Sequence, residues 1–214
     1  IADDIYRVDD ALNVGFGWEL GPFATWDAMG LSETVQAMEK NGQRAAKWVY
    51  EMLEKGHTSF YKVEDGKRKY YDISSSSYKN IPGSDAFIIL ENHSNNIVWK
   101  NSGTHLIDIG DGVLNLEFKT KMNTIGGEVL DAIPKSIELA EKNFAGLVIG
   151  NQGENFSAGA NLAMMLMLAI EQEYDELSMA CKTFQNASMR IRYSSIPVVV
   201  APHHLTLGGG CEFC

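Results

Sequence analysis

Two glycine-containing segments of the sequence could stabilise negative charge on a ligand oxygen. The first runs from Gly153 to Asn161 and reads GENFSAGAN, and the second runs from Leu207 to Glu212 and reads LGGGCE. Each follows a short apolar stretch and leads into residues typical of a helix, so each leaves backbone N–H groups unpaired at a helix start. Glycine also lets a ligand approach the backbone closely. One donor from each segment would form an oxyanion hole for a thioester carbonyl that gains negative charge.

Glu212 supplies a carboxylate for the same chemistry. It lies one turn into the helix expected after the second glycine segment, where it could exchange a proton with carbon or with water. Taken singly, the triple glycine is also typical of a tight turn, and Ser-Ala-Gly-Ala over 157–160 is typical of a tightly packed helix start. Because both segments follow short apolar strands, the pair favours a functional site over two unrelated turns.

Both segments resemble the signature motifs of the crotonase superfamily, to which the enoyl-CoA hydratases belong. The first signature is similar to residues 153–162 and the second to residues 207–213. The run from 110 to 123 resembles the opening strand and turn of that family. The resemblance covers residues 106–214, and it implies the front half of a domain that binds an acyl-CoA thioester.

The resemblance implies a role for particular residues. Ala160 and Gly209 would be the oxyanion N–H donors, and Glu212 would be one of two acid/base carboxylates. The second carboxylate is expected beyond Cys214. The residues implied in contact with the CoA or acyl part of the substrate are Ala158, Gly159 and Gly208.

Three positions depart from the family pattern. Asn161 stands where the family usually has Asp, and His203 and His204 precede the second motif where the family usually has a glycine. The two histidines could line the pocket, although a loop histidine is more often merely solvated. Since the second carboxylate is not in the chain, a hydratase and a single-carboxylate enoyl-CoA isomerase both remain open.

The first part of the chain has a resemblance of its own. Residues 10–30, which include GFGWELGPF and WDAMG, look like the C-terminal helical domain of 3-hydroxyacyl-CoA dehydrogenases. Gly15 and Gly17 do not indicate a dinucleotide site, because no strand precedes them and the third glycine is misplaced. The resemblance implies a NAD-binding domain upstream of Ile1. We therefore expect no cofactor site and no metal site in this chain.

The elements that position these residues suggest an α/β fold. We expect crotonase-like strand-turn-helix (ββα) units, preceded by a helical dehydrogenase segment. The expected domains are the end of the dehydrogenase domain over 1–56, a connecting segment over 57–105, and the first half of the crotonase domain over 106–214. Strands alternating with helices in the last part predict parallel pairing.

Periodicity predicts individual elements within these stretches. Helical spacing runs from Val35 to Leu53 and ends at Gly56, and Asp65-Gly66 is typical of a two-residue hairpin turn. Residues 74–77 read as a loop, whereas 87–90 and 97–99 are compatible with a short helix or with strands. Further predictions are a half-buried strand over 114–119, a helix over 128–143 that Pro134 kinks or starts, buried strands over 147–149 and 198–200, a buried helix over 162–170 and an amphipathic helix over 177–191.

Composition limits the partners. The formal net charge of −10 argues against nucleic acid and against a broad anionic membrane surface. The chain begins with Ile1 rather than Met and shows no signal peptide, so we expect a piece of a longer cytoplasmic protein. The cysteines at positions 181, 211 and 214 show no metal spacing and no paired framework, which predicts reduced thiols.

Together the two resemblances imply the middle of a bifunctional fatty-acid β-oxidation enzyme. Its parent would hydrate a trans-2-enoyl-CoA and oxidise the 3-hydroxyacyl-CoA product with NAD, while the isolated chain would be inactive or weakly active. The expected partners are the acyl-CoA substrate, further copies of the chain or a thiolase. The alternatives are a single-carboxylate isomerase and a non-catalytic structural or docking module.

Overall fold

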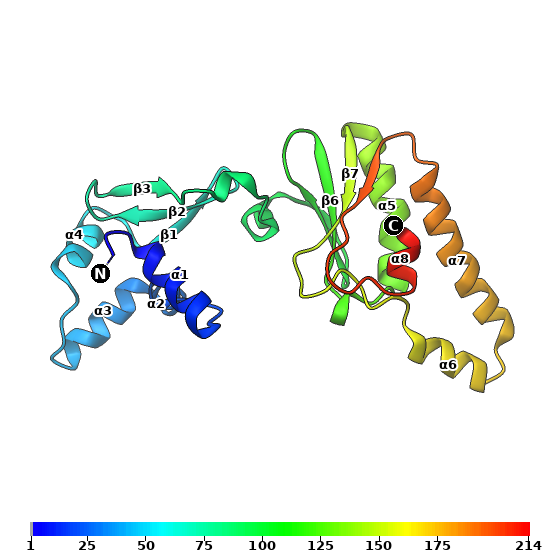
Figure 1. Ribbon diagram of the computed structural model, residues 1–214, viewed down its shortest axis with the longest axis horizontal. Helices are drawn as coiled ribbons and strands as arrows, with labels where there is room; N and C mark the ends of the chain where they lie inside the picture. The colour runs from blue at the N-terminus through cyan, green and yellow to red at the C-terminus, as the bar shows by residue number, and fades with distance from the viewer. Residues whose placement is uncertain (1) are drawn as a thin grey trace. The chain divides into compact units, whose positions relative to one another are not determined.

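The computed structural model describes residues 2–214, with the exception of the side chain of Asp85. The chain forms two compact units, Ile1–Ile88 and Ile89–Cys214 (Figure 1). The stretch expected to connect two domains is therefore divided: residues 57–88 pack with the first unit, and residues 89–105 pack with the second. None of the helices formed by residues 2–214 is long and apolar enough to span a membrane.

Helices make up the start of the first unit. They are α1 (Ile5–Phe16), α2 (Pro22–Met29), α3 (Leu31–Lys40) and α4 (Lys47–Glu54). Gly17 ends α1 in the left-handed conformation, and Pro22 occupies the first position of α2, where its missing N–H costs nothing. The periodic stretch expected as one helix is two, because the chain breaks at Gly42, which has a φ of 71°.

An antiparallel sheet completes the first unit. Its strands are β1 (Tyr61–Glu64), β2 (Lys67–Asp72) and β3 (Ser77–Asn80), followed by the 3-10 turn η1 (Ser84–Ala86). Asp65 and Gly66 have φ values of 54° and 69°, as the two-residue hairpin turn requires. The predicted hairpin is confirmed, and residues 74–76 form the loop before β3.

Two carboxylates hold the helices of the first unit to its sheet. The buried Asp9 side chain accepts hydrogen bonds from the Phe23 and Ala24 N–H groups at the start of α2, each at 2.9 Å, and from the Tyr61 hydroxyl. Asp27 accepts from the backbone N–H groups of Phe60 and Tyr61 at 2.7 and 2.8 Å. Burial raises the pKa of Asp27 above its ordinary value. These bonds give the WDAMG segment a structural role.

The second unit is built on a mixed sheet with the strand order β4-β5-β6-β7-β8. The first three strands pair antiparallel and the last three pair parallel, as predicted for strands separated by helices. The segment 97–99 is therefore a strand, and residues 90–96 form a 3-10 helix. The bounds are η2 (Leu90–Asn96), β4 (Ile97–Lys100), β5 (Thr104–Asp108), β6 (Val113–Phe118), η3 (Lys121–Asn123), β7 (Gly146–Ile149) and β8 (Val198–Val200).

Helices cover one face of this sheet in two layers. α5 (Gly127–Asn143) packs on β5, β6 and β7, and α7 (Tyr174–Arg192) packs on α5 (Figure 1). Pro134 lies inside α5 and does not start it. The short helix α8 (Gly209–Phe213) packs against α7. The fully buried core of the unit comprises Leu106, Leu114, Leu116, Val129, Ala132, Ile133, Ile137, Ala140, Ile149 and Phe156.

Burial corrects three of the sequence-based expectations. β6 is buried on both faces, and its buried polar side chains have partners: Asn115 donates to the Gly150 carbonyl and Glu117 pairs with Lys119. β8 is only partly buried, with Val199 57% exposed. The apolar helix α6 (Leu162–Ile170) has no buried residue, and its methionines are not core. Apolar composition alone does not say whether a helix has a partner to pack on.

Candidate functional site

The two glycine segments lie side by side, although about 50 residues separate them in sequence. Ser157 forms a parallel bridge with Thr206. Its N–H donates to the Leu205 carbonyl at 3.2 Å, and its carbonyl accepts from the Leu207 N–H at 3.0 Å. The Phe156 N–H donates to the His203 carbonyl at 3.1 Å. The pairing brings both segments to the same place, beyond the carboxyl ends of β7 and β8.

Gly159 is where the two backbones come closest. A Cβ atom at this position would lie 2.7 Å from the Leu207 carbonyl oxygen and 3.4 Å from the Gly209 nitrogen. Its φ of +89° is also unfavourable for any residue with a side chain. Glycine is required here for both reasons, and the contact places Ala160, the next residue, close to the start of α8.

Two backbone amides at this contact are unpaired. Among the described residues, neither the Ala160 N–H nor the Gly209 N–H donates a hydrogen bond within the protein, whereas the Gly210 N–H donates to the Leu207 carbonyl at 2.9 Å. These are the two amides that the resemblance to the crotonase superfamily implies as oxyanion donors. The two amides that precede Ala160 are occupied: the Ala158 N–H donates to the Met122 carbonyl, and the Gly159 N–H donates to the Ser157 hydroxyl.

An asparagine and serine network that sequence reasoning missed fixes the first segment. Asn123 Nδ2 donates to Asn151 Oδ1 and to the Asn155 carbonyl, both at 2.9 Å. Asn151 Nδ2 donates to the Phe156 carbonyl, and the Ser157 hydroxyl donates to the Asn123 carbonyl at 2.7 Å. Because these groups are buried or half-buried, the network holds the loop in one conformation. Asn123 has a φ of 50°, which asparagine tolerates better than most residues.

α7 and α8 fix the second segment. Gly208 precedes α8 with a φ of +46°, and Gly209 and Gly210 are buried. A Cβ atom at Gly209 would lie 2.5 Å from the tip of the Phe184 ring. Phe184, from α7, stacks on Phe213 with ring centroids 4.7 Å apart and an interplanar angle of 5°. Sequence reasoning assigned Phe184 only to an amphipathic helix, and the glycine-rich turn gave no sign of the ring against it.

Glu212 lies on α8, three residues after Gly209, and is exposed. Its backbone N–H donates to the Gly208 carbonyl at 3.0 Å, which keeps it in the helix. Of the two histidines, His203 has its Nε2 2.9 Å from the Gly153 carbonyl oxygen, so it ties the two segments together. Within residues 2–214, no group of three or more His, Cys, Asp or Glu side chains is placed to hold a metal ion.

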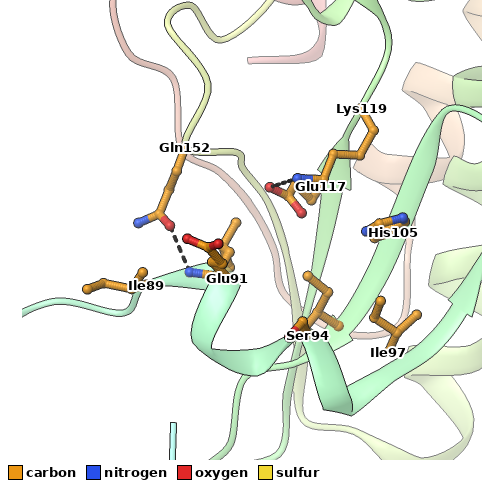
Figure 2. A pocket seen from close by; sticks show the side chains of 10 residues that line it. Ile89, Glu91, Ser94, Ile97, His105, Glu117, Lys119 and Gln152 are labelled. Atoms are coloured by element: carbon orange, nitrogen blue, oxygen red, sulfur yellow. Dashed lines mark hydrogen bonds and ion pairs between the residues drawn. The ribbon is translucent and has the colours of Figure 1, made fainter. Parts of the chain in front are cut away.

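A separate pocket of about 360 Å³ lies on the face of the sheet opposite α5. Figure 2 shows the Glu117–Lys119 ion pair on one side and Gln152, which accepts from the Leu90 N–H at 2.7 Å, on the other. His105 is the cross-strand neighbour of Glu117. Burial and the nearby Lys119 lower the pKa of this histidine. The lining residues are Ile89, Leu90, Glu91, Ser94, Ile97, His105, Ile107, Glu117, Lys119 and Gln152.

None of the predicted site residues lines this pocket. The Glu117 carboxylate is neutralised by Lys119 at 2.9 Å, and the Gln152 carbonyl oxygen is occupied by the Leu90 amide. These two pocket side chains are therefore already engaged within the protein. We take the contact between the two glycine segments as the candidate site.

Comparison with known proteins finds relatives along the whole chain, although no protein family model matches it. A Bacillus subtilis protein named "Probable 3-hydroxyacyl-CoA dehydrogenase" is 45% identical over 216 residues, which cover 100% of this chain and 27% of that protein. A Rickettsia felis protein, provisionally named a "fatty acid oxidation complex trifunctional enzyme", is 27% identical over 99% of this chain and 26% of its own length. The chain thus spans about a quarter of the curated relatives it matches.

Solved structures are similar to about half of the chain. An enoyl-CoA hydratase from Bacillus halodurans covers 52% of this chain and 46% of its own, with a TM-score of 0.48 and 19% identity. An enoyl-CoA hydratase from Thermoplasma volcanium covers 53% and 45%, with a TM-score of 0.46 and 25% identity.

Proposed function

We propose that this chain is part of a fatty-acid β-oxidation enzyme that acts on acyl-CoA thioesters. The second unit would provide the oxyanion hole and one carboxylate for the hydration of a trans-2-enoyl-CoA. The observation that carries the proposal is the meeting of two unpaired amides, those of Ala160 and Gly209, at the contact between the glycine segments. A thioester oxygen placed between them would accept from both N–H groups.

The proposed chemistry follows from these groups. Addition of water to an α,β-unsaturated thioester moves negative charge onto the thioester oxygen, and two fixed amide donors stabilise that charge. Glu212 would transfer a proton between water and the substrate. Because the Ala158 and Gly159 amides are already paired, these residues and Gly208 would contact the substrate through carbonyl groups or close backbone approach.

The apolar helix α6 supports an acyl substrate. It begins directly after the first glycine segment, where the Asn161 side chain caps it by accepting from the Met164 N–H at 3.3 Å. Leu162, Leu166 and Ile170 are 74%, 61% and 64% exposed. An acyl chain leaving the thioester could cover part of this surface, and methionines adapt their packing to such ligands.

The first unit would belong to the dehydrogenase helical domain of the same enzyme. The support is the similarity to the Bacillus subtilis relative, which covers 100% of this chain and so both units. In this reading NAD binds upstream of the chain, and oligomerisation or a thiolase partner involves surfaces of the whole enzyme. The isolated chain would then show no dehydrogenase turnover and little hydration.

A matched pair of variants at Gly209 tests the proposal in full-length protein that contains this chain. Gly209→Ala and Gly209→Pro both add a Cβ atom against Phe184, but only proline removes the N–H. Proline is tolerated at the first position of a helix. We expect hydration of trans-2-enoyl-CoA to be lower in the proline variant than in the alanine variant by roughly 100- to 1,000-fold, as for loss of one oxyanion donor. Equal rates of hydration in the two variants would show that the Gly209 N–H is not an oxyanion donor.

Glu212→Gln tests the carboxylate separately. The change keeps the size of the side chain and removes proton transfer, so hydration should fall by roughly 100- to 10,000-fold with little change in substrate binding. Dehydrogenase turnover, measured in the same preparation, should survive because its chemistry would lie in another domain. Unchanged hydration would show that Glu212 does not transfer a proton in the reaction. Assay with a 3-enoyl-CoA detects isomerisation, which a single-carboxylate enzyme would catalyse in place of hydration.

A further inference from the structure

A closely spaced pair of cysteines lies at the end of α8, with Cys211 inside the helix and Cys214 at its C-cap. Cys211 and Cys214 enclose Glu212 and Phe213 in a C-x-x-C sequence, and both cysteines are exposed and free. In the structure, Cys211 lies in α8 two residues after Gly209, and Cys214 is the residue that follows the helix.

The backbone holds these two cysteines at a separation suited to a disulfide. The Cys214 N–H donates to the Cys211 carbonyl at 3.1 Å, which closes a turn of four residues. Such a turn keeps the first and last Cα atoms within about 7 Å. Disulfides join Cα atoms about 4.4–6.8 Å apart. A modest adjustment of side-chain torsions would therefore bring the sulfurs together without unfolding α8.

The environment of the Cys214 thiol differs from that of a free thiol. Burial and the neighbouring Cys211 raise the pKa of the Cys214 thiol. Cys214 Sγ donates to the Gly210 carbonyl at 3.2 Å. Both residues are exposed, but only the Cys214 thiol is held by a hydrogen bond among the described residues, whereas the Cys211 thiol is free to meet a small disulfide. This difference suits a thiol–disulfide exchange in which Cys211 reacts first with the small disulfide and Cys214 then displaces it.

A metal is a poorer fit to this pair than a disulfide. Structural zinc takes four protein ligands and catalytic zinc takes three. Among the residues described by the structure, no cluster of three or more His, Cys, Asp or Glu side chains supplies such a set. The pair is thus suited to redox chemistry.

We propose that Cys211 and Cys214 form a reversible disulfide that encloses Glu212. The oxidant would be a small disulfide such as oxidised glutathione. The Cys211 thiolate attacks one glutathione sulfur and releases one glutathione thiolate. The Cys214 thiolate then attacks the mixed disulfide and releases the second. The two cysteines lose two protons and two electrons, and one glutathione disulfide becomes two glutathione thiols.

Oxidation would change the candidate site directly. The Cys214 thiol must leave the Gly210 carbonyl, and Gly210 packs so tightly that a Cβ atom there would lie 2.8 Å from Ser157 Cβ. Glu212 would be held inside the closed ring. This effect on acyl-CoA chemistry rests on the proposed function, whereas disulfide formation itself does not.

Thiol chemistry of the 214-residue chain tests the disulfide. The chain is equilibrated with reduced and oxidised glutathione, the remaining thiols are alkylated, and the peptides are identified by mass spectrometry. We expect Cys211 and Cys214 to be protected together as an intramolecular disulfide while Cys181 is alkylated. Cys181→Ser should behave like wild type, and Cys214→Ser should stop at a mixed glutathione disulfide on Cys211. Alkylation of both Cys211 and Cys214 under oxidising buffer, or a disulfide that includes Cys181, would overturn the proposal.

A second measurement tests the effect on the site. Hydration by full-length protein containing this chain is followed after oxidation and after reduction with dithiothreitol. We expect oxidation to lower hydration in wild type and reduction to restore it, with no such change in Cys211→Ser. If the disulfide forms but hydration is unaffected in an active enzyme, the pair does not regulate the site. If the enzyme shows no hydration in either state, the proposed function fails while the disulfide stands on its own measurement.

Discussion

A Cβ atom on Gly159 would lie 3.4 Å from the backbone nitrogen of Gly209, so the two glycine segments approach each other without room for a side chain between them. This contact joins a loop that follows β7 to a loop that follows β8. We therefore expect that adding a side chain at Gly159 or at Gly209 lowers the unfolding free energy of the second unit.

Substitution of Gly159 by alanine should destabilise the second unit by on the order of 3 kcal/mol. A positive φ in a residue with a side chain costs about 1–3 kcal/mol. The added methyl would also meet the Leu207 carbonyl oxygen at 2.7 Å. Urea unfolding of the chain, followed by a signal from the second unit, measures the change.

Gly110→Ala is the matched control for that measurement. Gly110 has a φ of +92°, close to the +89° of Gly159, but a Cβ atom there would meet nothing within 4 Å. The control should therefore report the conformational cost alone, on the order of 1–2 kcal/mol. Equal destabilisation by the two variants would mean that the contact with Leu207 is not tight in solution.

Substitution of Gly209 by alanine should cost about 1–3 kcal/mol, because the new methyl overlaps the Phe184 ring. Phe184→Leu should remove much of that overlap. In a double-mutant cycle, the Gly209→Ala cost should be smaller in the Phe184→Leu background than in wild type. Additive costs would show that Phe184 does not press on the glycine.

Asn123→Asp should weaken the network that holds the first glycine segment. The amide donates to Asn151 Oδ1 and to the Asn155 carbonyl, and a carboxylate at the same place would face both acceptors. We expect a loss of about 1–3 kcal/mol, because two hydrogen bonds are lost and the carboxylate faces two acceptor oxygens without a donor. Asn186→Asp, at an exposed position of α7, makes the same chemical change and should alter the unfolding free energy little. A comparable loss in both variants would point to net charge as the cause.

The Glu141–Arg190 pair should make the attachment of α7 to α5 sensitive to acid. Arg190 donates to both carboxylate oxygens of Glu141, and the Ser195 N–H donates to one of them at 2.9 Å. These donors lower the pKa of Glu141 from 4.5 to about 2. Because the folded pKa is the lower one, the stabilisation is present above pH 4.5 and is lost as the pH falls toward 2.

Glu141→Gln should remove this contribution. The variant should have a lower melting temperature than wild type at neutral pH, and the difference should shrink as the pH falls below about 4.5. Thermal unfolding monitored by circular dichroism across that range measures it. Glu171→Gln, at an exposed position after α6, serves as the control. A melting-temperature difference that does not depend on pH would contradict the assigned pair.

The local elements of this protein were determined by its sequence. The turn at Asp65-Gly66, the helix over 127–143 and the strands over 146–149 and 198–200 follow from turn chemistry and apolar periodicity, which act over a few residues. Parallel pairing of the last strands also followed, because helices separate them. The candidate donors Ala160 and Gly209 were found in the same way, from glycine motifs and a family resemblance.

Tertiary structure alone decided how these elements meet. The bonds from Asn123 to Asn151 and Asn155 span 28 and 32 residues, and the contact of Phe184 with Gly209 links two helices. α6 was expected in a core and is exposed. Its nine apolar residues favour burial of the helix, but they do not say which surface, if any, covers it. Local patterns depend on neighbours in the chain, whereas burial and loop contacts depend on neighbours in space, which no short segment encodes.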